Sequence, residues 1–394
     1  MNLAQRVLER AQAQAGQTAA LLAELVRIPS PTGGEGEVAA CLRRRMEEAG
    51  FEEVRCDGLG NVIGRIGRGR RLLAFDGHLD TVGPGNPENW SFDPYGGEIR
   101  DGHVCGRGAA DQKGGVAAMV AAGRILRELG FDRDLSVFFV GSVMEEDCDG
   151  LCWKYLIEEE GLRPEAVVST EPTDGGLYRG QRGRMEIEVD FRGVSAHGSA
   201  PERGRNAVYA AARACLAIEA LNERLRTDAF LGKGSVTVSR FVSDGPSLCA
   251  VPDSARLHLD RRLTAGETRE SAVAEIEALV AGEDARVRVL DYLESSWTGR
   301  RYGMPKYYPT WSWPEDHPAV ACGAAVHREL FGTPPRLGRW TFSTNGVTIS
   351  GLYGIPTIGY GPGAEAMAHA PDEKIPIADL VRAAAFYALY ALRF

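Results

Sequence analysis

The sequence lacks any apolar run that approaches the length of a membrane span, and it has no pair of C-x-x-C motifs. A transmembrane helix needs about 20 apolar residues, so the sequence argues against a membrane partner. Positive charges are fewer than negative ones, because the chain has 45 lysines and arginines and 54 aspartates and glutamates, for a net charge of -9. This balance argues against binding to nucleic acid or to an anionic membrane.

The eight cysteines are scattered along the chain. Thiols without disulfide or zinc-ribbon spacing indicate reduced cysteines, so we expect a cytoplasmic protein. Cys148 and Cys152 lie one helical turn apart beside Glu145 and Glu146. A redox or metal-binding role is open to these two thiols, but inert packing is the favoured interpretation.

The chain of 394 residues is long enough for two domains, and its pattern begins as α/β. Helices are predicted over residues 2–27, 34–49 and 113–129, and a β-hairpin over 51–66. Short apolar runs at 72–75, 135–140 and 166–168 are typical of buried parallel strands. The same α/β pattern resumes near the end of the chain.

The pattern changes after residue 181. Residues 184–191 alternate strictly between polar and apolar, as a half-buried antiparallel strand should. A helix (206–225), two strands (233–242 and 254–262), a helix (267–279) and a strand (285–290) are predicted to follow. This β-α-β-β-α-β order is typical of a ferredoxin-like domain. We therefore predict a domain of residues 181–293 inserted into a domain formed by 1–180 and 294–394, with a long aromatic and proline-rich loop over 296–318.

Acid and imidazole side chains follow these apolar runs or lie in glycine-rich turns. Sites in open α/β sheets lie just beyond the carboxyl ends of the strands, so such side chains are expected to converge. The candidates are His78 and Asp80 after the first run, Asp111 in a glycine-rich loop, Glu145 and Glu146 after the second run, Glu171 after the third, and His369 after Tyr360-Gly361-Pro362-Gly363.

Residues of these types suit two zinc ions. Zinc accepts imidazole and carboxylate ligands, and a catalytic zinc keeps one position for water. His78 is a first ligand candidate, and Asp80 can hold the other nitrogen of its imidazole. Asp111 has a short side chain with two oxygens, which suits a bridge between two metals. Two metals about 3.5–4 Å apart can stabilise both oxygens of a hydrolysis.

The adjacent Glu145 and Glu146 cannot face the same direction, so one is expected to bind metal and the other to act as a base on water. Glu171 and His369 would complete the ligand shells. Each residue taken alone has a commoner explanation, such as a turn-forming aspartate or a solvated glutamate pair. Gly106-x-Gly108 resembles the start of a dinucleotide fingerprint, but the third glycine is missing. The joint pattern therefore favours a metal hydrolase over nucleotide binding.

Taken together, five segments resemble the co-catalytic zinc hydrolases, the family of acetylornithine deacetylase, succinyl-diaminopimelate desuccinylase, aminoacylase, peptidase T and the glutamate carboxypeptidases. The segments are G-H-L-D (77–80), G-R-G-A-A-D-Q-K-G-G (106–115), M-E-E-D (144–147), T-E-P-T (170–173) and A-H-A-P (368–371). The resemblance covers essentially the whole chain. It implies an α/β catalytic domain like that of the zinc exopeptidases, with a mixed central sheet flanked by helices.

The resemblance also implies roles for the candidate residues. Two zinc ions would be bound, with cobalt or manganese as alternatives. His78 and Glu171 would bind one ion, Glu146 and His369 the other, and Asp111 would bridge them. Asp80 would orient His78, and Glu145 would be the general base.

The inserted domain resembles the lid and dimerisation domain of the same family, through G-V-S-A-H-G-S-A-P (193–201). The resemblance implies a homodimer in which His197 reaches the partner's active site and stabilises the oxyanion. Asn206 and Arg262 match positions that hold the substrate, and Arg261 is expected on the opposite face. A guanidinium binds a carboxylate through two parallel hydrogen bonds. A locally satisfied histidine and arginines in ordinary salt bridges are the alternatives.

Two segments depart from the best-known members. Phe342-Ser343-Thr344-Asn345-Gly346 has Asn345 where deacetylases usually carry an aspartate, and residues 306–311 form an aromatic segment. Both are similar to the selenium-metabolism-associated hydrolase branch. Asn345 predicts a substrate with less positive charge at that point, or one with its own carboxylate. The backbone amides of Gly361 and Gly363 are candidates to meet a carboxylate or carbonyl oxygen.

Three functions compete at this point. The first is an amidohydrolase that cleaves the amide bond of an N-acyl amino acid or a related small amide with a carboxylate. The second is a dipeptidase or carboxypeptidase of the same fold. The third is a non-catalytic metal-binding scaffold, which is disfavoured because no ligand and no base is missing.

Overall fold

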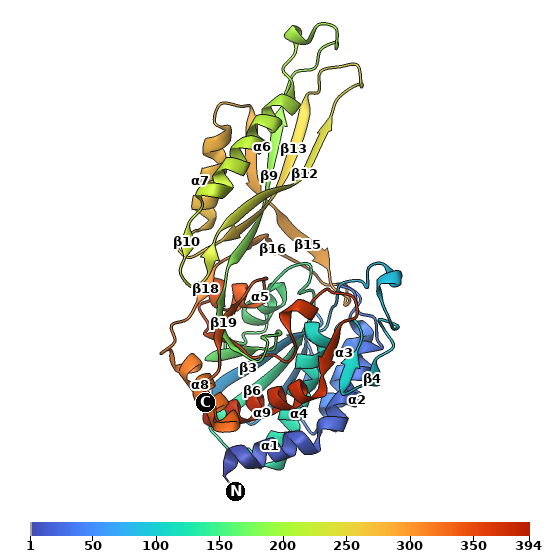
Figure 1. Ribbon diagram of the computed structural model, residues 1–394, viewed down its shortest axis with the longest axis vertical. Coiled ribbons are helices and arrows are strands. Elements are labelled where there is room, and N and C mark those ends of the chain that lie inside the picture. Colours follow the sequence, from blue (N-terminus) through green and yellow to red (C-terminus); the bar gives the residue numbers. More distant parts are fainter. Residues whose placement is uncertain (1) are drawn as a thin grey trace.

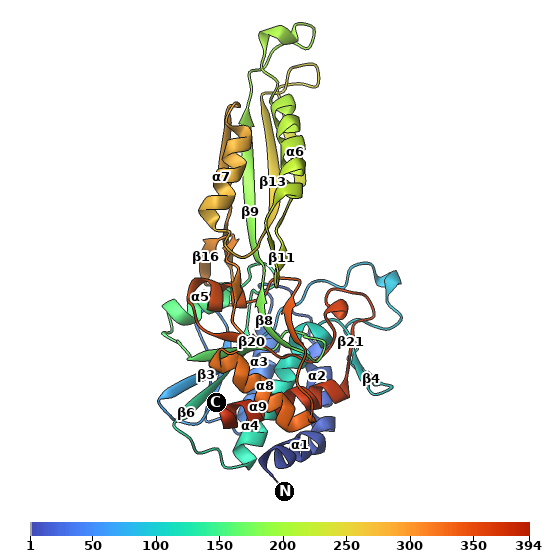
Figure 2. The same cartoon turned by 60° about the vertical axis from the view of Figure 1, so that its left-hand side comes forward.

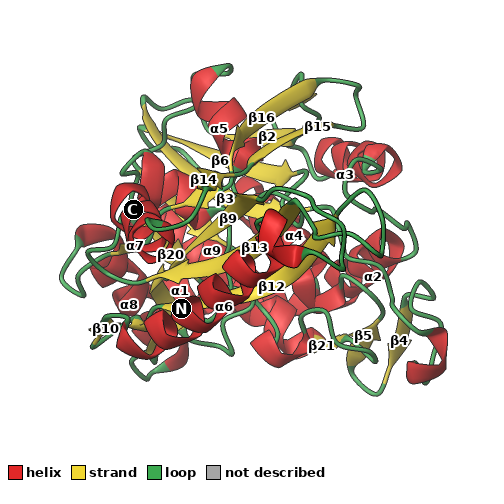
Figure 3. Cartoon of the chain, turned by 90° about the horizontal axis from the view of Figure 1, so that it is seen from above, coloured by secondary structure: helices red, strands yellow, loops and turns green. Residues whose placement is uncertain are grey.

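The computed structural model describes residues 2–394. Figure 1 shows a broad unit built around a large sheet, with a narrow second unit extending from it. Viewed from above, helices surround the central strands of the broad unit (Figure 3). No helix within residues 2–394 is long and apolar enough to cross a membrane.

The large sheet is mixed, as predicted. Its order is β1-β2-β6-β3-β7-β20-β8-β18, and β19 also pairs with β8. The central strands β6, β3, β7 and β20 run parallel to one another. The strands are β1 (Glu53–Cys56), β2 (Val62–Ile66), β3 (Arg71–His78), β6 (Leu135–Ser142), β7 (Ala166–Ser169), β8 (Leu177–Gln181), β18 (Trp311–Ser312), β19 (Leu337–Trp340) and β20 (Thr357–Gly359).

Helices cover both faces of this sheet. Figure 1 shows α5 on one side of β3 and β6, and α4, α9 and α1 on the other. The helices of the broad unit are α1 (Leu3–Ala13), α2 (Ala15–Val26), α3 (Gly36–Glu48), α4 (Gly114–Glu128), α5 (Leu151–Glu158), α8 (Pro318–Phe331) and α9 (Ile377–Arg393). Smaller elements are β4 (Glu98–Arg100), β5 (His103–Cys105) and β21 (Lys374–Pro376), which form a three-stranded sheet.

The predicted helix over 2–27 is in fact two helices. They meet at Gln14, whose φ of -93° and ψ of 2° interrupt the helical path. The first helix buries Ala4, Val7 and Ala11, and the second buries a separate apolar stripe that includes Leu22 and Val26. The change of direction lets each helix present its own stripe to the core.

The narrow unit has the predicted β-α-β-β-α-β order. Its elements are β9 (Gly183–Arg192), α6 (Ala207–Arg224), β12 (Ser235–Asp244), β13 (Ser254–Leu263), α7 (Arg269–Val280) and β14 (Ala285–Val289). The antiparallel sheet has the order β12-β13-β9-β14, and β10 (Thr227–Asp228) pairs with β11 (Gly232–Lys233) beside it. Alternate residues of β9 from Met185 to Phe191 pack into a core of their own with α6 and α7. The opposite face of this sheet carries the charged residues.

The prediction of a loop over 296–318 is wrong. This segment contains β16 (Arg301–Pro305), β17 (Tyr307–Tyr308) and β18, and β16 pairs with β15 (Asp291–Ser295). The buried Tyr308 and Trp311 anchor it, β17 to β9 and β18 to β8. The segment therefore ties the two sheets together, and the predicted domain boundary at 293/294 falls inside β15.

Candidate metal centre and substrate cavity

The candidate metal ligands come together at one edge of the large sheet. His78 is the last residue of β3, Glu145 and Glu146 follow β6, and Glu171 follows β7. These three strands are neighbours and parallel, so their carboxyl ends meet at the same edge. Asp111 lies in the turn before α4, and His369 lies in the loop after β20.

Asp111 lies between two histidine–glutamate pairs. Its Oδ1 is 3.0 Å from His78 Nε2, and its Oδ2 is 3.5 Å from His369 Nε2. Glu171 Oε1 is 3.7 Å from His78 Nε2, and Glu146 Oε2 is 3.0 Å from His369 Nε2. One carboxylate thus faces both pairs, which is the arrangement that a bridging ligand needs.

The charge balance of this cluster fits divalent cations. Glu145 Oε1 and Glu171 Oε2 are buried and have no hydrogen-bond partner among residues 2–394. Burial raises the pKa of Glu145, Glu146 and Glu171, because so many carboxylates are held together away from water. Ligand atoms of His78, Glu145 and Glu171 lie within 4.8 Å of one another, as do those of His78, Asp111 and Glu146. Imidazole and carboxylate donors at this spacing suit zinc.

Asp80 orients the imidazole of His78 through its main chain. The Nδ1 atom of His78 is 2.8 Å from the carbonyl oxygen of Asp80 and 3.6 Å from its carboxylate Oδ1. An Nδ1–H that donates to this carbonyl leaves Nε2 free to face a metal. The carboxylate of Asp80, which was expected to contact this nitrogen, is too distant for a hydrogen bond. The reason is that β3 ends at His78, so residues 79–80 no longer follow strand alternation.

The Asp80 carboxylate instead holds the turn that carries the two glutamates. It accepts hydrogen bonds from the backbone N–H of Glu145 (3.2 Å) and of Glu146 (3.0 Å). Glu35, which the sequence reasoning missed, accepts the N–H of Met144 at 3.0 Å. Two buried carboxylates therefore fix three consecutive amides. The signal that could have found Glu35 is an acid at the start of the helix predicted over 34–49.

A buried ion pair shapes the turn that carries Asp111, and it was also missed. Arg107 Nη1 lies 2.7 Å from Glu373 Oε2, and these side chains are only 2% and 0% exposed. Glu373 also accepts the N–H groups of Gly108 (3.0 Å), Ala110 (2.7 Å) and Asp111 (3.0 Å). Arg107 donates to the carbonyl oxygen of His369 at 3.4 Å. The pair therefore links the backbone of the Asp111 turn to the His369 loop.

Arg262 lies on the wall of the cavity above this cluster, and Arg261 points the other way. The cavity has a volume of about 360 Å³ and is lined by residues that include Asp111, Glu145, Arg184 and Arg262. Arg261 is fully buried in the core of the narrow unit, where it pairs with Glu267 at 2.6 Å. Successive residues of a strand face opposite sides, which explains the division.

Asn345 does not line this cavity, which corrects its assignment as a substrate residue. Its Nδ2 donates to Asp76 Oδ2 (2.9 Å) and to Ser142 Oγ (3.2 Å), and its Oδ1 accepts the N–H of Gly150 at 2.8 Å. The side chain is 1% exposed. An asparagine suits this position because its amide donates to the buried carboxylate of Asp76, which a second carboxylate would repel.

Two other predicted substrate residues are also engaged elsewhere. The Oδ1 of Asn206 caps α6 by accepting the N–H groups of Val208 (2.9 Å) and Tyr209 (3.4 Å). The N–H of Gly361 donates to Thr173 Oγ1 at 3.2 Å, so this amide is used inside the protein rather than presented to a ligand. Gly363 is buried, and its carbonyl accepts the N–H of Asp174 at 3.2 Å.

His197 is remote from the metal cavity of its own chain. The loop between β9 and α6, which carries it, lies at the end of the narrow unit farthest from the large sheet (Figure 1 and Figure 2). His197 is exposed, and its loop pairs with the neighbouring loop through a bridge to Ala250.

Cys148 and Cys152 are buried and packed. Cys148 Sγ is 3.4 Å from the hydroxyl of Tyr308, and Cys152 Sγ donates to Asn345 Oδ1 at 3.1 Å. Burial raises the pKa of both thiols, so the reactive thiolate is disfavoured. These contacts support the interpretation of inert packing.

Comparisons with known proteins agree with this geometry. The pattern of peptidase family M20/M25/M40 matches residues 74–393. The uncharacterized protein YgeY of Escherichia coli (strain K12) is 50% identical over 388 residues, which cover 98% of this chain and 96% of that protein. A succinyl-diaminopimelate desuccinylase of Paracoccus denitrificans is 30% identical over 390 residues, which cover 92% and 94%. A tripeptidase from Staphylococcus aureus shares the fold, with a TM-score of 0.73 at 21% identity over 96% of this chain and 99% of that one.

Proposed function

The chain belongs to peptidase family M20/M25/M40, and within it we propose a dimetal amidohydrolase that cleaves the amide bond of an N-acyl amino acid or a related small amide with a carboxylate. It is a metal-dependent hydrolase of amide bonds, as its family and its desuccinylase relatives are. The observation that carries the proposal is Asp111 between the pairs His78–Glu171 and His369–Glu146.

These five residues would hold the two metals, with zinc favoured and cobalt or manganese as alternatives. When bound, the metals supply Lewis-acid activation of water and of the amide carbonyl. Glu145 would act as the proton carrier, because its Oε1 is buried without a partner beside the cluster. It can accept the proton of the attacking water at that oxygen and deliver it to the leaving nitrogen.

His197 would supply an oxyanion donor to the partner's cavity. Its Nδ1 accepts the N–H of Ser199 at 3.1 Å, and in the neutral imidazole the proton then lies on Nε2. That Nε2–H is free to stabilise the charge that develops on the substrate oxygen. An exposed histidine on a loop remote from its own cavity is the feature that favours action in trans.

A homodimer through the narrow unit would place this loop. Tyr209 and Leu216 on α6 and Phe241 and Val242 on β12 are exposed large hydrophobic residues. The edge strand β12 also has unpaired backbone groups on its outer side. A second copy would cover these apolar side chains and extend the sheet. We keep the cytoplasm as the proposed location, because all eight cysteines are free.

A dipeptidase is the second candidate, favoured by carboxylates in a second cavity that adjoins the metal cavity. Asp147, Asp291 and Glu294 line this second cavity, and none forms an ion pair within residues 2–394. Such carboxylates could bind the free α-ammonium of a peptide, which an N-acyl amino acid lacks.

The test is a panel of N-acetyl, N-succinyl, N-formyl and N-carbamoyl amino acids together with dipeptides. Each would be assayed with zinc, cobalt or manganese and with a chelator control. Metal-dependent release of an amino acid from the acylated compounds supports the proposal, and release from dipeptides alone supports the second candidate. Protein that holds two metals and hydrolyses nothing in the panel would contradict both and would revive the scaffold interpretation.

A further inference from the structure

Two arginines lie side by side on the wall of the metal cavity. Arg184 on β9 stands directly opposite Arg262 on β13 in the antiparallel register. Both line the cavity that contains Asp111, Glu145 and His369. Like charges that face each other across a sheet destabilise it, so this placement requires a reason.

On each strand, a carboxylate two residues away from the arginine binds its guanidinium group on the side away from the metal cavity. Asp260 accepts hydrogen bonds from Arg262 Nε (2.7 Å) and Nη2 (3.0 Å), and Glu186 accepts one from Arg184 Nη2 (2.7 Å). Residues two apart on a strand share a face, and Glu186 stands opposite Asp260 in the register. Neither carboxylate lines the metal cavity. The two carboxylates therefore orient the arginines without blocking the side that faces the cavity.

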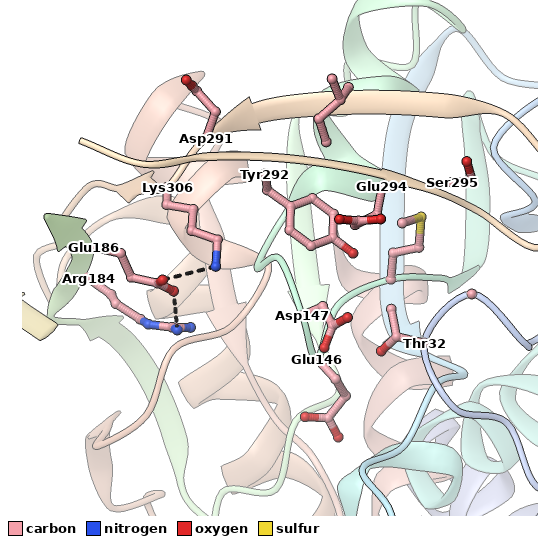
Figure 4. A pocket seen from close by; sticks show the side chains of 13 residues that line it. Thr32, Glu146, Asp147, Arg184, Glu186, Asp291, Tyr292, Glu294, Ser295 and Lys306 are labelled. Carbon is pink, nitrogen blue, oxygen red and sulfur yellow. Dashed lines mark hydrogen bonds and ion pairs between the residues drawn. The ribbon is translucent and has the colours of Figure 1, made fainter. Parts of the chain in front are cut away.

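Donors remain on that side. Arg262 uses Nε and Nη2 on Asp260, and Arg184 Nη1 makes a long contact of 3.4 Å to Asp149, which itself lines the metal cavity and would share this donor with a ligand. Lys306 also approaches Glu186, at 2.9 Å, so this carboxylate is shared between two cations (Figure 4). Formal charges of the six side chains in this ion-pair network cancel, so the N–H donors rather than an excess of charge would select a ligand. The set comprises the cations Arg184, Arg262 and Lys306 and the carboxylates Asp149, Glu186 and Asp260.

Arg184 also lies where two cavities meet. It lines both the metal cavity and the adjoining cavity of about 640 Å³ drawn in Figure 4, and Glu146 is the other residue common to them. A small amide whose carbonyl lies at the metals would have space beyond Arg184 for its remaining atoms. The arginine is thus within reach of a substrate and not only part of the sheet.

We propose that Arg184 shares the carboxylate of the substrate with Arg262, the substrate residue expected from the sequence, and that Arg184 is thereby a specificity residue for the free carboxylate. The inference rests on the proposed function and adds a residue that recognises its substrate. A carboxylate accepts N–H donors from both guanidinium groups. A carboxamide presents its own N–H₂ to one of them and loses that bond, so the site would discriminate against it.

The experiment compares Arg184→Met and Arg262→Met with the control Arg256→Met. Arg256 is a matched arginine on β13 that pairs with Asp190 at 2.6 Å and lines neither cavity. For each protein, kcat/KM is measured on the amide of the panel that is hydrolysed fastest and on the corresponding carboxamide. Circular dichroism and metal analysis check that each variant is folded and loaded.

We expect Arg184→Met to lower kcat/KM for the carboxylate substrate by about tenfold to a hundredfold, the loss of one charge-assisted hydrogen bond. The carboxamide should change little, and Arg256→Met should change neither. Arg184→Lys should recover part of the loss, because it keeps the charge without the planar fork. Equal losses on both substrates would overturn the proposal, since a purely structural Arg184 would affect them alike.

Binding separates this inference from the proposed function. In Glu145→Gln protein loaded with metal, calorimetry would measure the affinities for N-acetylalanine and N-acetylalaninamide, with and without Arg184→Met. A preference for the carboxylate that disappears with Arg184→Met supports the arginine pair, even if the wild-type protein hydrolyses nothing in the panel. Equal affinities for the two probes in Glu145→Gln protein overturn it, even if amides are hydrolysed.

Discussion

The metal cavity and the loop at the tip of the narrow unit both present a histidine, but they hold it in different ways. His78 is 1% exposed, and its ring contacts the carbonyl of Asp80 on one side and the carboxylate of Asp111 on the other. His197 is exposed, and within residues 2–394 the hydrogen bonds of its ring are to Ser199 of its own loop. The metal cavity orients its candidate ligands through neighbouring strands and buried carboxylates, whereas the loop leaves the Nε2–H of His197 available.

The proposed roles follow this difference, because the metal cavity would need one chain and His197 would need a second. Five ligand candidates and Glu145 meet at the edge of one sheet without help from another molecule. The loop at the tip, in contrast, lies far from the metal cavity of its own chain. The four predictions that follow test this division, starting with the largest effect.

Glu145→Ala should lower kcat by at least about a thousandfold while the bound metal stays near two ions per chain. The reason is that Glu145 would carry the proton, whereas the five ligand candidates remain in place. Metal content by elemental analysis and turnover of the best panel substrate check this. Loss of a metal ion in the variant would instead make Glu145 a ligand, a role that its proximity to His78 and Glu171 also allows.

His197→Ala should lower kcat by about a hundredfold with unchanged metal content, because it removes one oxyanion donor. Mixing it with Glu145→Ala under conditions that exchange subunits gives a sharper test. A mixed dimer has one cavity with both Glu145 and the partner's His197, so about a quarter of wild-type activity should return. A mixture that stays inactive would place His197 outside the reaction of the partner.

Glu373→Gln should weaken metal binding by about tenfold to a hundredfold, because Glu373 holds three backbone amides of the Asp111 turn. The control is Glu267→Gln, which disturbs an equally buried pair with Arg261 in the core of the narrow unit. Each variant should lose about 3 kcal/mol of stability, but only the first should lose metal affinity. Competition with a chelator provides the readout. Equal metal affinities in the two variants would reduce Glu373 to a general structural role.

Asn345→Asp should have the smallest effect on catalysis and a clear effect on stability. The change removes the donor to Asp76 and puts a second carboxylate beside it, so the free energy of unfolding should fall by about 1–3 kcal/mol. Urea denaturation measures this fall, and kcat per folded molecule should stay close to wild type. A change in KM without a change in kcat would instead support Asn345 as a substrate residue.

The fold was predictable where the sequence pattern is regular. Strict alternation over 184–191 indicated β9, and the apolar runs before His78, Glu145 and Glu171 indicated three buried parallel strands. The segment 296–318 was not predictable, because its strands are short and paired to partners distant in sequence. The break at Gln14 has no strong signal either, since neither proline nor a capping side chain marks it.

The sequence by itself determined which side chains could bind metal and roughly where, because ligand-type residues at the ends of apolar runs must gather at one sheet edge. Only the tertiary structure decided which neighbours hold these side chains in place. Asp80 reaches His78 through its carbonyl because β3 ends there, and Asn345 is turned inward to Asp76. Glu35, Arg184 and Glu373 act through contacts to residues distant in sequence, and no local pattern encodes such contacts.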